Sequence, residues 1–180
     1  MKANRMIAGV VALAGASCIS TQAPDPRWPK ERPLKAMSQL NGVYRNESDD
    51  GRSLYDLLNG NLGTSNAKGR AVELRVAPDE KSVALRLRDG RGKVIESCLL
   101  RSGDDFILDD KRLSVKVPSS IGLTGTTNLG AFAGSGSVTV SPSESGGLLG
   151  HQSESGIGLL FYMVPFAGAD EERYYWPADR

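Results

Sequence analysis

Two neighbouring segments of the chain have a strict two-residue period in hydrophobicity. Residues 72–76 read Val-Glu-Leu-Arg-Val, and residues 83–88 read Val-Ala-Leu-Arg-Leu-Arg. Successive side chains of a β-strand point to opposite faces of a sheet, so each segment predicts a strand with one apolar face and one polar face. Half-buried strands of this kind are typical of an antiparallel sheet with one face in solvent.

Turn residues separate these strands and continue beyond them. Residues 78–80 read Pro-Asp-Glu, and residues 89–92 read Asp-Gly-Arg-Gly, a strong hairpin signal. Consecutive short hairpins predict an antiparallel meander. The further strands predicted are 94–101, 106–108, 113–117, one around Val138 and Val140, 156–164 and 173–176.

One short helix is predicted before the meander. Ser53 is a suitable N-cap, with Asp56 three residues later, and the leucines of residues 54–58 share one helical face. Asn59 and Gly60 follow as a stop signal.

We therefore expect a mainly β fold of eight or nine strands. Closure into a small barrel is the expected arrangement, because closure removes the exposed edges of a long meander. Residues 37–180 are expected to form this single domain. Residues 119–155 are rich in Gly and Ser and carry little charge, so their pattern predicts few elements.

The N-terminus has the organisation of a secretory signal. Lys2 and Arg5 precede an apolar run at residues 6–16, and Ser17 and Cys18 follow directly. The run is too short to cross a bilayer, which needs ~20 apolar residues. The cysteine at its end resembles the lipobox of bacterial lipoproteins, in which the cysteine is acylated and becomes the new N-terminus.

This resemblance implies a signal peptide at residues 1–17, lipid attachment at Cys18 and a membrane as partner. By analogy with that family, Ile19 after the cysteine favours the outer membrane, facing the periplasm. Residues 18–36 contain several prolines and are expected to form an extended tether that spans roughly 40 Å. Two alternatives for Trp28 are docking on the domain and a position at the lipid interface.

Ordinary signal cleavage is also open, after Ala16 or after Ala23, and would leave a soluble secreted protein. Cys18 and Cys98 are the two cysteines of the chain. If Cys18 is not acylated, the pair is able to form a disulfide worth about 4–5 kcal/mol in the chain-entropy model. If Cys18 is acylated, Cys98 is expected to pack as a small apolar side chain.

A second resemblance concerns the domain. The step Gly42-Val43-Tyr44 is similar to the Gly-x-aromatic step that opens the first strand of lipocalin-like (calycin-like) barrels. In that group a late basic residue packs against the aromatic ring, and Arg173 occupies the matching position. The resemblance implies a barrel that binds a small apolar ligand.

Catalytic and metal chemistry have little support in the sequence. His151 is the single histidine, is expected in a loop, and has no recognisable Ser or Cys partner motif. No cluster of His and Cys predicts a metal site, and no cofactor is expected. With 22 Lys and Arg against 21 Asp and Glu, the balanced charge argues against nucleic acid as partner.

The expected function is therefore non-enzymatic binding of a small apolar ligand or an envelope protein. Two alternatives are a periplasmic inhibitor or immunity-type protein, and an envelope enzyme that uses Asp104 or Asp109. A basic hairpin could also contact anionic lipid or lipopolysaccharide phosphate. The candidate ligand or partner contacts are Tyr44, Phe161, Tyr174, Tyr175 and Trp176, and the candidate anionic-surface contacts are Arg86, Arg88, Arg91 and Lys93.

Overall fold

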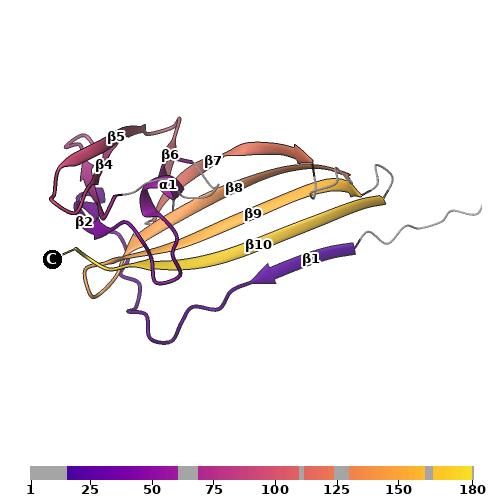
Figure 1. Cartoon of the computed structure of the whole chain (residues 1–180), viewed down its shortest axis with the longest axis horizontal. Coiled ribbons are helices and arrows are strands. Elements are labelled where there is room, and N and C mark those ends of the chain that lie inside the picture. The colour runs from indigo at the N-terminus through magenta and orange to yellow at the C-terminus, as the bar shows by residue number, and fades with distance from the viewer. Residues whose placement is uncertain (1–15, 61–68, 110–111, 124–129, 161–163, 180) are drawn as a thin grey trace, which may run out of the picture.

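The computed structural model describes residues 16–60, 69–109, 112–123, 130–160 and 164–179. These residues are mainly β, as expected, with two sheets, one α-helix and one short 3-10 helix (Figure 1). Both helices precede most of the strands: η1 is Met37–Leu40 and α1 is Leu54–Leu58.

The smaller sheet has four strands in the order β2-β3-β4-β5, and all its neighbours are antiparallel. The hairpins predicted from the two-residue period are confirmed here, including the turn at residues 89–92 between β4 and β5. The strands are β2 (Gly42–Arg45), β3 (Ala71–Val76), β4 (Ser82–Arg88) and β5 (Val94–Arg101).

The larger sheet has six strands in the order β1-β10-β9-β8-β7-β6. Its neighbours are antiparallel except for β1, which runs parallel to β10 along the edge. The strands are β1 (Ala16–Thr21), β6 (Phe106–Asp109), β7 (Arg112–Leu123), β8 (Gly130–Pro142), β9 (Leu148–Leu160) and β10 (Val164–Trp176).

Two expectations differ from this arrangement. The strands number ten in the described ranges rather than eight or nine, because residues 16–21 form an additional strand, β1. The described strands also form two sheets and not a closed barrel. The four strands β7–β10 have 12 or 13 residues and pair with one another, whereas β2–β5 have four to eight, so strand lengths do not match around a single ring.

The two sheets meet at two corners. An isolated bridge joins Tyr44 of β2 to Ala178 after β10, and another joins Ser102 after β5 to Phe106 of β6. The core lies between the sheets, at one end of the long strands, and β7–β10 extend well beyond it (Figure 1). One face of the long strands, with Val138, Val140 and Trp176, therefore faces the core near that end.

Helix α1 packs into this core. The Ser53 hydroxyl accepts a hydrogen bond from the Asp56 N–H at 3.2 Å, so the predicted N-cap is confirmed. All five helical residues are buried. Gly60 follows in a left-handed conformation, with φ of 73°, which confirms the predicted stop.

Candidate functional site

Residues 22–33, which follow β1, run over the outer face of the larger sheet, and we call this segment the strap. Its first residue is tied to β10, because the Gln22 N–H donates to the Glu171 carbonyl at 3.1 Å. Its far end is tied to the β8–β9 hairpin, because the Arg32 N–H donates to the Pro142 carbonyl at 2.8 Å. The expected free tether is therefore a docked segment over these residues.

Side chains hold the strap between these two ends. Arg112 of β7 donates two hydrogen bonds to the Glu31 carboxylate, at 2.7 and 2.8 Å. The Trp28 indole N–H donates to Asp49 at 2.5 Å, so the alternative prediction that Trp28 docks on the domain is confirmed. The strap turns once, where the Trp28 N–H donates to the Asp25 carbonyl at 3.0 Å, and then forms a single antiparallel bridge between Glu31 and Ser143.

A cleft of about 430 Å³ lies between the strap and the sheet. This volume is within the ordinary range for small-molecule sites. The strap supplies a wall of prolines and Trp28 with three charged residues, and β7–β10 supply a mixed floor. The lining residues are Pro24, Asp25, Pro26, Trp28, Pro29, Lys30 and Glu31 from the strap, and Arg112, Thr139, Ser141, Leu149, Gly150, His151 and Arg173 from the strands.

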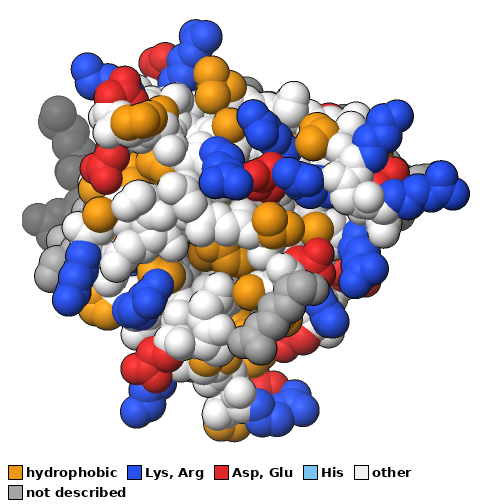
Figure 2. Space-filling model, turned by 90° about the vertical axis from the view of Figure 1, so that its left-hand side faces the viewer, with side chains coloured by type: hydrophobic (Ala, Val, Ile, Leu, Met, Phe, Trp, Pro, Cys, Tyr) orange, Lys and Arg blue, Asp and Glu red, His pale blue; other side chains and the backbone are white. Residues whose placement is uncertain are grey.

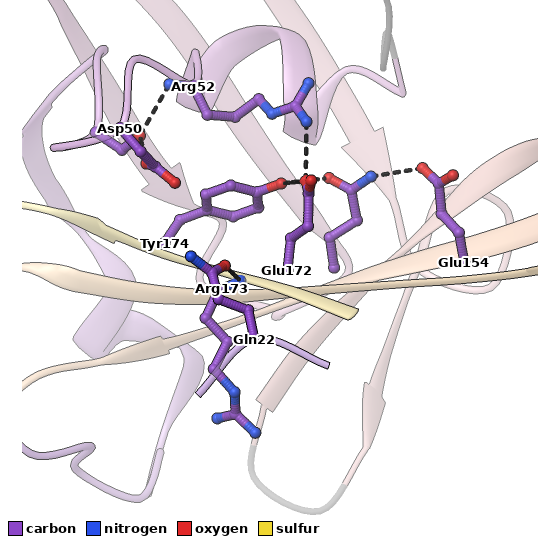
Figure 3. Close-up of polar contacts among 9 residues, drawn as sticks. Gln22, Asp50, Arg52, Glu154, Glu172, Arg173 and Tyr174 are labelled. Carbon is purple, nitrogen blue, oxygen red and sulfur yellow. Dashed lines mark hydrogen bonds and ion pairs between the residues drawn. The ribbon is translucent and has the colours of Figure 1, made fainter. Parts of the chain in front are cut away.

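Arg173 is the charged group of the cleft floor that lacks a partner. Its Nε is buried and has no hydrogen-bond partner in the described part of the chain. The Arg173 side chain points away from the side of β10 that carries Glu172 and Tyr174, as Figure 3 shows. Its own backbone N–H donates to the Gln22 side chain at 2.9 Å, which joins the strap to this position.

His151 lies beside Arg173 on the neighbouring strand, since the two residues are register partners of β9 and β10. The sequence placed His151 in a loop, and this was wrong because the Gly/Ser-rich segment 119–155 contains long strands. The His151 Nε2 atom is 3.6 Å from the Glu171 carboxylate, which also lies on β10.

The two acids of the cleft are already neutralised by the protein. Glu31 is paired with Arg112. Asp25 accepts hydrogen bonds from Arg27, which lower the pKa of Asp25 to about 2. Among the described residues Lys30 and Arg173 form no ion pair, so the cleft keeps positive charge for a ligand.

A polar network on the opposite face of β10 fixes the strand that carries Arg173 (Figure 3). The Tyr174 hydroxyl donates to the Glu172 carboxylate and lies 3.1 Å from Gln152 Oε1. Arg52 is 2.9 Å from Glu172 and stacks over the Tyr174 ring, with 5.6 Å to the ring centroid. The hydrogen bond from Tyr174, with that from Arg52, holds the pKa of Glu172 below its ordinary value.

Most of the aromatic candidates from the sequence belong to the core. Tyr44, Tyr174 and Trp176 are at most 3% exposed and therefore contact the protein interior rather than a surface ligand. Tyr175 is half-buried on the outer face, where its hydroxyl is 2.9 Å from the Ser145 hydroxyl. Phe161 lies outside the described residues.

The two cysteines are separated in the fold. The backbone of Cys18 pairs with Gly168 at the edge of the larger sheet. Cys98 is a free thiol of β5 that packs against the core, so the alternative disulfide does not form. Burial raises the pKa of the Cys98 thiol, which disfavours the reactive thiolate.

The basic candidates gather on the outer face of the smaller sheet. Arg86 and Arg88 surround Glu73 there, while Arg91 and Lys93 lie at the exposed β4–β5 turn. The sequence missed Arg75 and Glu73 as members of this group. Their outward positions in the two-residue period were visible, but the strand register that joins them to Arg86 and Arg88 was not.

Arg173 was expected to pack against Tyr44, by resemblance to lipocalin-like barrels. It lies instead on the outer face of β10, while Tyr44 is buried in the core. The signal that could have found the cleft is the alternation in Arg173-Tyr-Tyr-Trp176, which puts Arg173 and Trp176 on opposite faces.

Comparison of the chain with protein-family models, with curated proteins and with solved structures finds no match. None of the helices in the described ranges has the length and apolar character needed to cross a membrane. Within the same ranges, no group of three or more His, Cys, Asp or Glu side chains is arranged to hold a metal ion.

Proposed function

We propose that this protein is a non-enzymatic, lipid-anchored protein of the bacterial cell envelope that binds a small ligand in the strap cleft. The ligand has an apolar body and an anionic group. The core cluster lies between the two sheets, whereas the strap cleft lies on the outer face, so we place the ligand in the strap cleft.

The single observation that carries the ligand proposal is the position of Arg173. Its guanidinium has a buried Nε without a protein partner, in a cleft that also presents Trp28 and Leu149. A buried Nε–H is costly unless an acceptor reaches it, and a carboxylate, sulfonate or phosphate supplies paired acceptors for a guanidinium. Lys30 and Arg173 form no ion pair among the described residues, which suits binding of an anion.

The envelope location rests on the leader pattern of residues 2–18. The anchor is compatible with the fold, because β1 begins two residues before Cys18 and leads directly into the strap.

A lipocalin-like origin is part of this proposal. It is supported by Gly42, whose missing Cβ would come within 2.8 Å of the Tyr44 hydroxyl, so the ring folds over the glycine.

Two fluorescent probes test the cleft. Anilinonaphthalene sulfonate and phenylnaphthylamine share an aromatic body, and the sulfonate group distinguishes them. Arg173→Gln is expected to weaken binding of the sulfonate about tenfold or more, because a hydrogen bond to a charged group is lost. The uncharged probe should bind with little change.

Arg91→Gln, at the exposed β4–β5 turn, is the matched control for loss of one positive charge. Equal weakening of sulfonate binding in both variants would show a general charge effect and contradict the assignment of Arg173. An unchanged sulfonate affinity in Arg173→Gln would also contradict the assignment of Arg173.

The anchor is tested separately with Cys18→Ser. This variant should lose fatty-acid labelling and either release the domain into the soluble fraction or accumulate as an unprocessed precursor. Acylation would be refuted if the wild-type chain is membrane-bound without a fatty acid and Cys18→Ser has the same electrophoretic mobility.

A further inference from the structure

Three arginines share one buried carboxylate on the outer face of the smaller sheet. The Glu73 side chain of β3 is 3% exposed. Arg75 Nε lies 2.7 Å from Glu73 Oε1, Arg88 Nη2 lies 2.5 Å from Oε2, and Arg86 Nη1 lies 3.8 Å from Oε2. One negative charge therefore faces three positive charges, and the cluster keeps a net positive charge.

Glu73 fixes these guanidinium groups without using all their donors. The Arg88 Nη1 group also donates to the Gly92 carbonyl at 2.9 Å, so Arg88 bridges the carboxylate and the β4–β5 turn. Arg75 uses its Nε toward Glu73, and its terminal nitrogens remain as donors. Since the Arg75 and Arg86 side chains are 62% and 49% exposed, an outside anion can reach them.

Exposed apolar side chains lie beside the arginines on the edge strand β5. Val94 pairs in register with Arg88, and Leu99 pairs with Ala84, which shares its face with Arg86. Val94 and Leu99 are 41% and 52% exposed, and the adjacent Ile95 is 48% exposed. Figure 2 shows this end of the molecule, where Lys and Arg side chains lie near exposed hydrophobic ones.

We infer that this face, formed by Arg75, Arg86, Arg88, Val94 and Leu99, docks on a lipid surface that carries anionic phosphate groups. Guanidinium groups bind phosphate oxygens in pairs, and their fixed orientation reduces the entropy lost on binding. The apolar side chains of β5 would enter the boundary between headgroups and acyl chains.

The apolar neighbours decide between a lipid surface and free phosphate. A free anion would contact the arginines alone and leave the β5 side chains in water. A membrane surface satisfies both groups, since anionic headgroups attract the cations and the interface accepts the apolar side chains. The charge is local to this face, because the whole chain has a formal net charge of +1.

This docking face is separate from the proposed anchor. Cys18 lies in β1, on the larger sheet, and the arginine cluster lies on the smaller one. The test therefore uses the full chain with Cys18→Ser, so that an acyl chain contributes nothing. Sedimentation with vesicles of neutral phosphatidylcholine, and with vesicles that contain phosphatidylglycerol, measures the partition coefficient.

The Arg75→Gln/Arg86→Gln double variant removes the two exposed cations and leaves Arg88 to pair with Glu73. We expect its partition onto anionic vesicles to fall about tenfold to thirtyfold, given the usual contribution of each basic residue near such a surface. The matched control is Arg27→Gln/Arg32→Gln, which removes two exposed arginines of the strap and should change partition little. Leu99→Ser should weaken binding severalfold when high salt screens the charges.

Equal losses in the two double variants would overturn the inference. If the Cys18→Ser chain with no other substitution binds anionic vesicles no better than neutral ones, the inference is overturned as well. If inorganic phosphate releases the protein more effectively than chloride at equal ionic strength, and Leu99→Ser has no effect, the cluster is a free-phosphate site and the lipid surface is refuted.

Discussion

Gly150 of β9 lies against the indole ring of Trp176 in β10, and a Cβ at position 150 would come within 2.4 Å of that ring. Trp176 is fully buried, and its indole N–H donates to the Arg52 carbonyl at 3.1 Å. The absence of a side chain at position 150 therefore allows the largest core residue to pack over the neighbouring strand.

Gly150→Ala is expected to lower the free energy of unfolding by about 1–3 kcal/mol, because the added methyl group forces the ring out of its position. Urea denaturation measures the change. Gly90→Ala is the control, since a Cβ there meets no atom within 4 Å. Backbone entropy alone favours Ala over Gly, because Ala lowers the entropy of the unfolded chain. Equal destabilisation by both substitutions would therefore contradict the role of the contact with Trp176.

Glu73→Gln should destabilise the smaller sheet because it leaves three arginines without a counter-charge. The hydrogen bonds from Arg88 and Arg75 hold the pKa of Glu73 below its ordinary value. Their stabilisation is therefore complete above the unfolded-state pKa of about 4.3 and disappears as pH falls through the lower folded-state pKa.

We expect the difference in unfolding free energy between the wild type and Glu73→Gln to be about 1–3 kcal/mol at neutral pH, and to vanish in acid. Glu31→Gln, which breaks the half-exposed pair with Arg112, should cost less than ~1 kcal/mol. A difference that is independent of pH would contradict this account of Glu73.

Tyr44 should contribute to loss of stability in alkali. Burial raises the pKa of Tyr44 to about 12, and its hydroxyl donates to the Leu40 carbonyl at 3.0 Å. The stabilisation is complete below the unfolded-state pKa of about 10 and is lost as pH rises through the folded-state value.

Tyr44→Phe should therefore be less stable than the wild type by about 1 kcal/mol at neutral pH, through loss of one hydrogen bond. The difference in unfolding free energy between the two proteins should narrow as pH rises from 10 toward 12. Ionisation of Tyr44 destabilises the wild type over this range, whereas Phe does not ionise. Denaturation curves across this range measure it, and a constant gap would disprove the role of Tyr44 ionisation.

Trp28→Phe should weaken binding of anilinonaphthalene sulfonate severalfold while changing the unfolding free energy by less than ~1 kcal/mol. The substitution keeps an aromatic ring but removes the N–H that reaches Asp49, so the strap is held less firmly over the cleft. Asp49→Ala removes the same bond and should have a similar effect.

The double variant Trp28→Phe/Asp49→Ala provides the control. If the Trp28–Asp49 bond is the cause, the double variant should bind the probe about as well as either single variant. Additive losses would indicate two independent contributions to the cleft.

The sequence predicted the parts of the fold where side-chain burial follows the backbone period. β3 and β4 alternate apolar with polar or small residues, and α1 has Ser53 as its cap. The long strands β8 and β9 were harder to predict, because Gly and Ser replace apolar residues over much of their length. Pairing of their backbones, as between Gly134 and Gly156, leaves no hydrophobic signature.

The candidate sites depend on contacts between distant segments. Trp28 and Arg173 line one cleft because the strap folds back over β10, and nothing local in either segment indicates this. Arg75 joins Arg86 only through the β3–β4 register. The expected closed barrel is not found among the described residues, for a similar reason: strand lengths are local, but closure depends on how all the strands pair.

The pairing of β1 with β10 means that any cleavage near the N-terminus would affect the edge of the larger sheet. Six residues of β1 cover the outer edge of β10, whose backbone donors and acceptors would otherwise be open to a strand from another molecule. Cleavage after Ala16 keeps most of this cover, whereas cleavage after Ala23 removes it entirely. Cleavage after Ala23 would therefore leave β10 as an exposed edge strand with unpaired backbone groups. A chain cut there should self-associate as its concentration rises.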